Sequence, residues 1–182
     1  MSISSSTEKD FTKVFPYSTL TVAPGKPTYA AIEQTQREIL ACASSIAYIR
    51  GGVQHRKLGL VMTPSDYDLV APVTPYIRPV HPGDPPTFNG MTQREIHANE
   101  GHYIARVSNF KNINQLEHQL TNLLLSAYYQ KWLAVIMDPI TGQMNKQLPL
   151  IFSLLYTNYG QITPTALNQK RDACTNLVYN TR

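Results

Sequence analysis

Residues 112–137 read NINQLEHQLTNLLLSAYYQKWLAVIM, and this stretch decides the fold class of the chain. Its apolar side chains alternate at spacings of three and four residues, which is the period of one buried helix face. They are Ile113, Leu116, Leu120, Leu123, Leu124, Ala127 and Tyr128. Because Asn112 is a good N-cap residue, the pattern predicts one long helix from Ile113 to Met137. The apolar residues from Trp132 onward widen the stripe and indicate burial on more than one side there.

Three more helices are predicted around this stretch. Residues 92–108 form one, because Thr92 is an N-cap and Glu95 follows it at the capping-box position. Residues 148–159 form another, which has a proline in its first turn and Gly160 just past its end. A Thr-Pro pair at residues 163 and 164 predicts a last helix that continues to about residue 177.

The N-terminal half carries weaker helical signals. Thr28 follows a proline and caps a predicted helix that reaches about Ile46, with apolar residues at helical spacing. The apolar run at residues 58–62 is predicted to be a strand or a buried extended segment. Thr63 and the proline after it open a short helix that continues through Leu69.

The chain is expected to form one mainly α-helical domain, a small helical bundle spanning residues 14–178. The Ser/Thr-rich residues 1–13 are predicted to be a disordered tail, and residues 179–182 are the C-terminal end. Residues 14–21 provide at most a short N-terminal β segment. Six prolines in residues 71–90 predict an extended surface loop inside the domain, because proline fixes φ and removes an amide donor.

The composition limits the function classes. Of 182 residues, 42% are hydrophobic but only 15% are charged, below the roughly 25% typical of soluble domains. A surface this poor in charge resists association less, which suits self-assembly. The net charge of +4 is spread thinly, so RNA binding is expected to be weak and salt-sensitive. The polar N-terminus resembles no signal peptide, and no apolar run is long enough to cross a membrane.

Neither an enzyme nor a metal site is predicted. Cys42 and Cys174 lack zinc-ligand spacing, and both are expected to be buried small hydrophobes in a reduced, intracellular setting. His97 and Glu100 share a helix face, but His102 lies five residues from His97 and points elsewhere, so a polar, solvated face is favoured over a metal site. A deep pocket that gathered His97 and Glu100 with Asp138 would favour an enzymatic interpretation. The prediction therefore has no catalytic, metal or cofactor residues, no cofactor and no small-molecule substrate.

Two sets of residues are candidates for contacts with partners. His55, Arg56 and Lys57 follow a Gly-Gly loop and are predicted to contact RNA or a neighbouring subunit, although a purely structural turn is favoured. Aromatic residues concentrate near the ends of two predicted helices. Most fit core packing, but Tyr129 and Tyr159 are candidates for a subunit interface, where aromatic residues are enriched.

Several stretches carry a family resemblance when they are taken in order. They are GKPTYAAI at 25–32, ASSI at 43–46, GGVQHRKLGL at 51–60, TPSDY at 63–67, RPVHPGDPP at 78–86 and TGQMNKQLPLIFSLLYTNYGQIT at 141–163. Together they resemble the N-terminal part of Gag polyproteins from copia-type LTR retrotransposons of microbial eukaryotes. The similarity covers roughly residues 25–177. The loop at 51–57 departs from the family, whose loop is richer in glycine and histidine.

This resemblance implies a helical capsid N-terminal domain that assembles with copies of itself into virus-like particles and packages element RNA. Its expected partners are other copies of itself and, weakly, element RNA, in a cytoplasmic particle without membrane contact. The family's second capsid domain, zinc knuckle and enzymes are missing, so the resemblance implies a Gag fragment, a truncated relic or a domesticated host copy. A weak nucleic-acid-binding helical module is the alternative.

Overall fold

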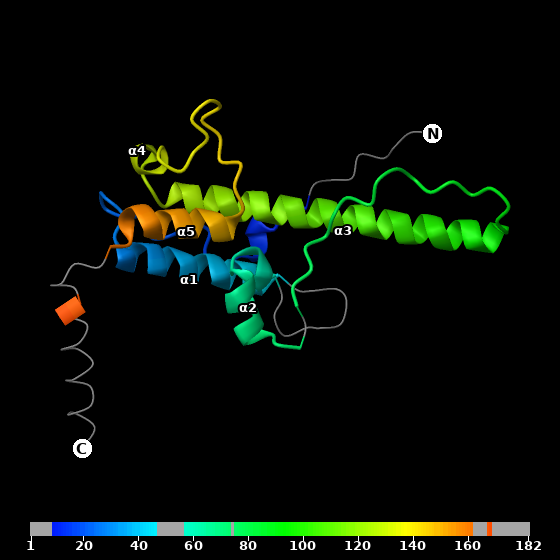
Figure 1. The fold of residues 1–182 in the computed structure, drawn as a ribbon, viewed down its shortest axis with the longest axis horizontal. Coiled ribbons are helices and arrows are strands. Elements are labelled where there is room, and N and C mark those ends of the chain that lie inside the picture. The colour runs from blue at the N-terminus through cyan, green and yellow to red at the C-terminus, as the bar shows by residue number, and fades with distance from the viewer. Residues whose placement is uncertain (1–8, 47–56, 74, 162–166, 169–182) are drawn as a thin grey trace, which may run out of the picture.

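The computed structural model of the protein describes residues 9–46, 57–73, 75–161 and 167–168. Within them the chain is mainly helical and contains no β-strand, which confirms the predicted fold class (Figure 1). The α-helices are α1 (Tyr29–Ser45), α2 (Pro64–Val70), α3 (Gln93–Ser126), α4 (Gln130–Leu133) and α5 (Leu148–Tyr159). Two short 3-10 turns accompany them, η1 (Thr12–Val14) and η2 (Leu58–Leu60).

Three predicted N-caps are confirmed. The hydroxyl groups of Thr28 and Thr63 accept hydrogen bonds from backbone N–H groups three residues later, at 3.3 and 3.2 Å. Thr92 and Glu95 form the predicted capping box, in which each side chain accepts from the other residue's backbone N–H. Each cap satisfies helix donors that otherwise have no partner, so these threonines set where α1, α2 and α3 begin.

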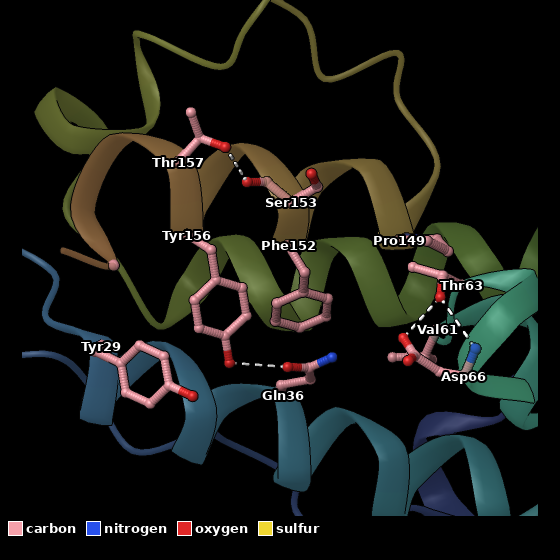
Figure 2. A pocket seen from close by; sticks show the side chains of 11 residues that line it. Tyr29, Gln36, Val61, Thr63, Asp66, Pro149, Phe152, Ser153, Tyr156 and Thr157 are labelled. Atoms are coloured by element: carbon pink, nitrogen blue, oxygen red, sulfur yellow. Dashed lines mark hydrogen bonds between the residues drawn. The ribbon is translucent and has the colours of Figure 1, made fainter. Parts of the chain in front are cut away.

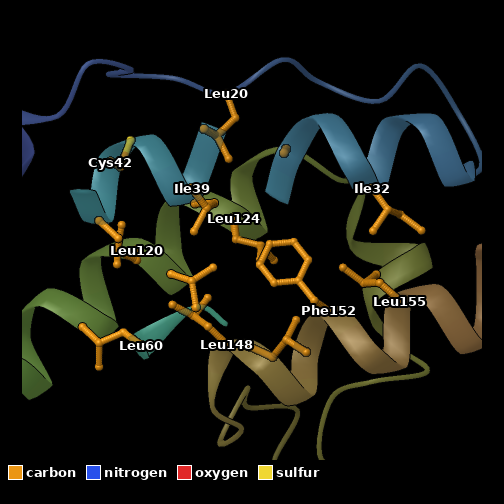
Figure 3. Close-up of a cluster of buried hydrophobic side chains, with 14 of the residues drawn as sticks. Leu20, Ile32, Ile39, Cys42, Leu60, Leu120, Leu124, Leu148, Phe152 and Leu155 are labelled. Atoms are coloured by element: carbon orange, nitrogen blue, oxygen red, sulfur yellow. The ribbon is translucent and has the colours of Figure 1, made fainter. Parts of the chain in front are cut away.

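Helices α1, α3 and α5 enclose the core (Figures 1 and 3). The predicted stripe of α3 is buried at Ile113, Leu116, Leu120 and Leu124, and it meets apolar residues of the other two helices. The largest fully buried side chains are Ile32, Ile39, Leu60, Val61, Ile113, Leu116, Leu120, Leu124, Ile136, Leu148, Ile151 and Leu155. Since their burial removes apolar surface from water, this cluster is the main source of the stability of the bundle.

The predicted break before Asn112 is wrong, because α3 runs without interruption for 34 residues. At 1.5 Å per residue it is about 50 Å long. Its N-terminal half, Gln93 to about Lys111, extends beyond the bundle of α1 and α5 and is called the arm below (Figure 1). An asparagine inside a helix costs only a few tenths of a kcal/mol, so continuing the helix is easier than breaking it and capping a new one.

The predicted end at Met137 is also wrong, because α3 stops at Ser126 and the chain turns before α4. Two contacts from elsewhere in the sequence hold this turn. The backbone N–H of Ala23 donates to the carbonyl of Ala127 at 3.0 Å. The buried hydroxyl of Tyr128 donates to Thr35 Oγ1 at 2.9 Å. Neither contact has a local sequence signal.

The N-terminal segment lies against the bundle from residue 9 onward. The backbone N–H of Phe11 donates to Gln119 Oε1 at 3.0 Å, and Gln119 Nε2 donates to the carbonyl of Lys9 at 3.3 Å. Further along, Leu20 and Ala23 are buried in the core. Contact with α3 therefore begins before residue 14, where the domain was predicted to start, and residues 1–8 lie outside the described part.

The proline-rich loop is confirmed as an irregular segment between α2 and α3, and part of it lies alongside the arm (Figure 1). Arg78 forms a two-pronged ion pair with Glu117 of α3. The ring of His81 packs edge-on against Phe110 at 5.2 Å between centroids. Tyr103 donates from its hydroxyl to the carbonyl of Gly83 at 3.0 Å. These contacts fix one side of the loop on α3.

The run at residues 58–62 is neither a strand nor extended, since it forms the 3-10 turn η2 with Leu60 and Val61 buried. The predicted helix after residue 163 lies outside the described residues apart from residues 167 and 168, which are helical. Cys174 lies outside them too, whereas Cys42 is buried as expected.

Gly59 of η2 is predicted to tolerate no side chain. A Cβ there would stand 2.2 Å from Cγ and 2.7 Å from Cβ of Tyr76, the residue that precedes the exposed part of the proline-rich loop. Gly59→Ala is expected to lower the free energy of unfolding by about 1–3 kcal/mol, because the ring has to leave its place in the core. Urea unfolding followed by circular dichroism measures this. The same substitution at Gly101, where a Cβ meets nothing within 4 Å, is the control and is expected to be neutral or stabilising.

Candidate functional site

A groove of about 590 Å³ opens between α1, α5 and the start of α2 (Figure 2). Helix α1 provides one wall, α5 the opposite wall, and the segment from η2 to α2 closes one end. Its lining residues are Tyr29, Gln36, Val61, Thr63, Asp66, Pro149, Phe152, Ser153, Tyr156, Thr157 and Gly160. This volume lies within the range of small-ligand pockets. It is also large enough to take a few side chains of another protein chain.

The floor of the groove is aromatic. Phe152 reaches down from α5 into the core, and the Tyr29 and Tyr156 rings lie 5.4 Å apart, tilted by 52° (Figure 2). Tyr156 donates from its hydroxyl to Gln36 Oε1 at 2.9 Å, which ties α5 to α1. Burial, with smaller contributions from Tyr29 and Glu33, raises the pKa of Tyr156 to about 12. Its hydroxyl therefore stays neutral and keeps donating at physiological pH.

The rim of the groove carries hydroxyl groups and one carboxylate. At the α2 end, Thr63 donates to Asp66 Oδ2 at 2.6 Å and accepts from the Asp66 backbone N–H. Along α5, Thr157 donates to the backbone carbonyl of Ser153 at 2.8 Å. The Thr63 and Thr157 hydroxyl protons are used within the chain, so the groups that line the groove and can donate to a partner's backbone carbonyls are the Gln36 amide and the Ser153 hydroxyl. The aromatic floor suits a partner that offers apolar side chains.

A row of exposed hydrophobic side chains is the second surface feature. It begins at the end of α2 and continues along the proline-rich loop, and it is called the outer row below. Its members are Leu69, Val70, Val73, Ile77 and Val80. Single exposed apolar residues are normal, but a run of neighbours within twelve positions indicates a contact surface.

Of the predicted RNA or lattice contacts, His55 and Arg56 lie outside the described residues. Lys57 is described, and its side chain is buried beside η2. Burial lowers the pKa of its ammonium group. Lys57 is therefore poorly exposed for contact with an RNA phosphate. Because His55 and Arg56 lie outside the described residues, an RNA or subunit contact made by this loop stays a prediction.

The two predicted interface tyrosines differ in their surroundings. Tyr129 is exposed just before α4. Tyr159 donates from its hydroxyl to the carbonyl of Trp132 at 2.7 Å, and its ring packs edge-on against the Trp132 ring at 6.1 Å. Lys26 Nζ lies 5.9 Å from the centroid of the Tyr159 ring. Tyr159 therefore makes contacts within the chain, whereas Tyr129 is exposed and its role at a subunit interface stays a prediction.

The residues considered for metal or acid–base chemistry do not come together. His97 and Glu100 lie on the exposed arm with 3.8 Å between Nδ1 and Oε2, whereas Asp138 follows α4 at the other end of α3 (Figure 1). Asp138 shapes a turn: the backbone N–H groups of Thr141 and Ile140 and the Thr141 hydroxyl donate to it and lower the pKa of its carboxyl. Within the described ranges, no three His, Cys, Asp or Glu residues are grouped to hold a metal ion.

Sequence reasoning missed the groove because its residues come from three separate stretches. A local signal exists on α5, where the polar Ser153 and Thr157 stand at a spacing of four in a largely apolar helix. That spacing places both on one exposed helix face. The outer row was visible in the sequence as aliphatic residues among the prolines, but the sequence did not tell that they point outward.

Helices in the described part of the chain are either too short or too polar to span a bilayer. The groove and the outer row are the two surface features of this helical bundle that suit contact with another macromolecule. Comparison of the chain with protein-family models, with curated proteins and with solved structures finds no match in any of the three.

Proposed function

We propose that this chain is a self-assembling structural protein, the Gag-like capsid N-terminal domain of a copia-type retrotransposon. The observation that carries the proposal is the outer row, five large hydrophobic side chains that are exposed within twelve positions of a helical chain in which only 15% of residues are charged. Water disfavours such a row, and few charged groups oppose the approach of a second copy. The resemblance of residues 25–177 to Gag proteins agrees with this function.

The mechanism of assembly is multivalent. Each copy offers weak contacts of fixed geometry, and closure into a particle multiplies their effect. The packaged partner is element RNA, held weakly because the net charge of +4 is dispersed. On this proposal the chain binds no small molecule and works in the cytoplasm as part of a particle.

The purified chain is expected to associate reversibly, with a dissociation constant on the order of 0.1 mM. Sedimentation velocity from about 10 µM to about 1 mM measures this as a rising weight-average sedimentation coefficient. Dilution of the concentrated sample is the control, because a reversible assembly returns to monomer and an aggregate does not. A chain that sediments as a monomer over the whole range contradicts self-assembly, and negative-stain electron microscopy checks for closed particles.

A further inference from the structure

Contacts to α3 hold one side of the proline-rich segment 75–86, and near its start the ring of Tyr76 packs edge-on against Tyr67 of α2 at 5.7 Å between centroids. Arg78 and His81 bind α3 through Glu117 and Phe110, and Gly83 accepts a hydrogen bond from Tyr103. The other side of the segment carries Ile77, 81% exposed, and Val80, 71% exposed. A spacing of three residues brings both to the same side of an extended proline-type helix, which has three residues per turn.

This arrangement suits docking. A partner that binds the segment does not have to order it, because the prolines and the contacts to α3 already fix its backbone. An extended proline-rich strand also leaves most of its backbone carbonyls without internal partners. Such strands are recognised by aromatic-lined grooves, in which proline and aliphatic side chains pack on ring faces and polar groups bind the carbonyls.

The groove between α1 and α5 has this chemistry. The rings of Tyr29, Phe152 and Tyr156 form its floor, and Gln36 and Ser153 stand beside them (Figure 2). The segment does not fill the groove of its own chain, because its anchors on Glu117 and Phe110 hold it along α3 instead (Figure 1). Each copy therefore presents both an unfilled groove and a preformed strand.

We propose that segment 75–86 of one copy docks through Ile77 and Val80 into the groove between α1 and α5 of a second copy. The contact joins two different surfaces, so it is head-to-tail, and each added copy leaves one groove and one segment open. Such a contact extends into rings or filaments rather than stopping at a dimer. This inference rests on the proposed self-assembly and specifies the contact that drives it.

A peptide tests the contact directly. A fluorescent peptide of residues 75–86 is expected to bind the wild-type chain saturably in fluorescence anisotropy. Ser153→Arg places a long charged side chain over the groove and is expected to weaken binding roughly tenfold or more. Thr157→Arg is a second groove variant in case the first fails to fold. Asn158→Arg, exposed on α5 outside the groove lining, is the matched control and leaves binding unchanged.

The peptide in which Ile77 and Val80 are both serine is expected not to bind. If it binds as well as the native peptide, or if Asn158→Arg weakens binding as much as Ser153→Arg, the proposed contact is wrong. A native peptide that does not bind overturns it too. A peptide that binds while the full chain stays monomeric overturns the second copy as the occupant of the groove.

Mixing variants of the full chain tests the head-to-tail geometry. Ile77→Asp spoils the segment, and Ser153→Arg spoils the groove, so each variant alone is expected to remain monomeric. A one-to-one mixture retains one intact groove and one intact segment, and it is expected to stop at a heterodimer in sedimentation velocity. Ile140→Asp is the control: Ile140 is 92% exposed, outside both surfaces, and this variant assembles as the wild type does.

The outcomes separate the two proposals. If the wild type and both variants associate equally, this contact is wrong and self-assembly by another surface stands. If the wild type remains monomeric, the proposed function and the contact are both wrong.

Discussion

Phe152→Ala is expected to lower the free energy of unfolding by about 3–5 kcal/mol, the largest effect of any single substitution considered for this chain. Phe152 is 2% exposed and lies in the core among residues of α1, α3 and α5 (Figure 3). Its loss removes apolar contacts and leaves a cavity that the three helices cannot fill by moving together without breaking other contacts. Domains of this size are stable by only about 5–15 kcal/mol, so the substitution removes a large share of the free energy of unfolding.

Urea unfolding followed by circular dichroism measures the effect. Leu150→Ala on the same helix is the matched control, because Leu150 is 49% exposed and sits two residues away. It is expected to change the free energy of unfolding by less than about 1 kcal/mol. Equal effects of the two substitutions would mean that Phe152 is not part of the core. Since alanine favours helix more than phenylalanine does, helix propensity cannot explain a loss at Phe152.

The sequence predicts the parts of this fold that local physics determines. Thr28, Thr63 and Thr92 start helices because a hydroxyl three residues before an open N–H satisfies it whatever the rest of the chain does. The stripe from Ile113 to Leu124 is buried because only one helix face carries apolar side chains there. Prolines likewise keep the loop between α2 and α3 out of any helix.

Helix ends without a glycine or proline are where prediction fails. The sequence near Asn112 offers a cap, but an uninterrupted helix satisfies the same backbone groups and also buries Ile113 and Leu116. The end at Ser126 depends on Ala23 and Thr35, which lie about a hundred residues earlier and hold Ala127 and Tyr128. Contacts of that range leave no local pattern, so the stripe was predicted to continue to Met137.

For the candidate site, too, the sequence predicts features that depend on local structure and misses those that depend on tertiary contacts. Tyr129, a predicted candidate for a subunit interface, is exposed because it lies at the turn just before α4, and its contact with a partner stays a prediction. Lys57 looked available beside a glycine loop, but tertiary packing around η2 buries it. The groove combines α1, α2 and α5, so it exists only after the fold has formed. The aliphatic residues of the outer row can be recognised in the sequence. The exposure of Ile77 and Val80 follows from the contacts that Arg78 and His81 make with α3.

Glu38 is the second position where a large effect is expected, because it is a buried carboxylate that fastens the N-terminal segment to α1. It accepts hydrogen bonds from the Thr21 backbone N–H at 3.0 Å, the Thr21 hydroxyl at 2.8 Å and Gln34 Nε2 at 2.7 Å. Burial alone raises the pKa of Glu38, but these three donors together outweigh it and hold the pKa below its ordinary value.

Glu38→Gln is expected to lower the free energy of unfolding by about 1–3 kcal/mol at neutral pH, because one amide oxygen cannot replace two carboxylate oxygens for three donors. The pH dependence has a definite sign. Since the pKa is lower in the folded chain than in the unfolded one, the carboxylate stabilises the fold above about pH 5, and this contribution fades as the pH falls through the folded pKa. The difference between wild type and variant should therefore shrink on acidification.

Urea unfolding of both proteins at about pH 7 and about pH 3 measures this difference. Glu33→Gln on the same helix is the matched control, because Glu33 pairs with Arg37 at 2.8 Å near the surface. Exposed ion pairs contribute about 1 kcal/mol or less, so this variant is expected to stay close to the wild type. A Glu38→Gln variant whose deficit is the same at both pH values would show that the charge of Glu38 is not what fastens Thr21. The cost would then come from altered packing, because packing does not depend on proton concentration.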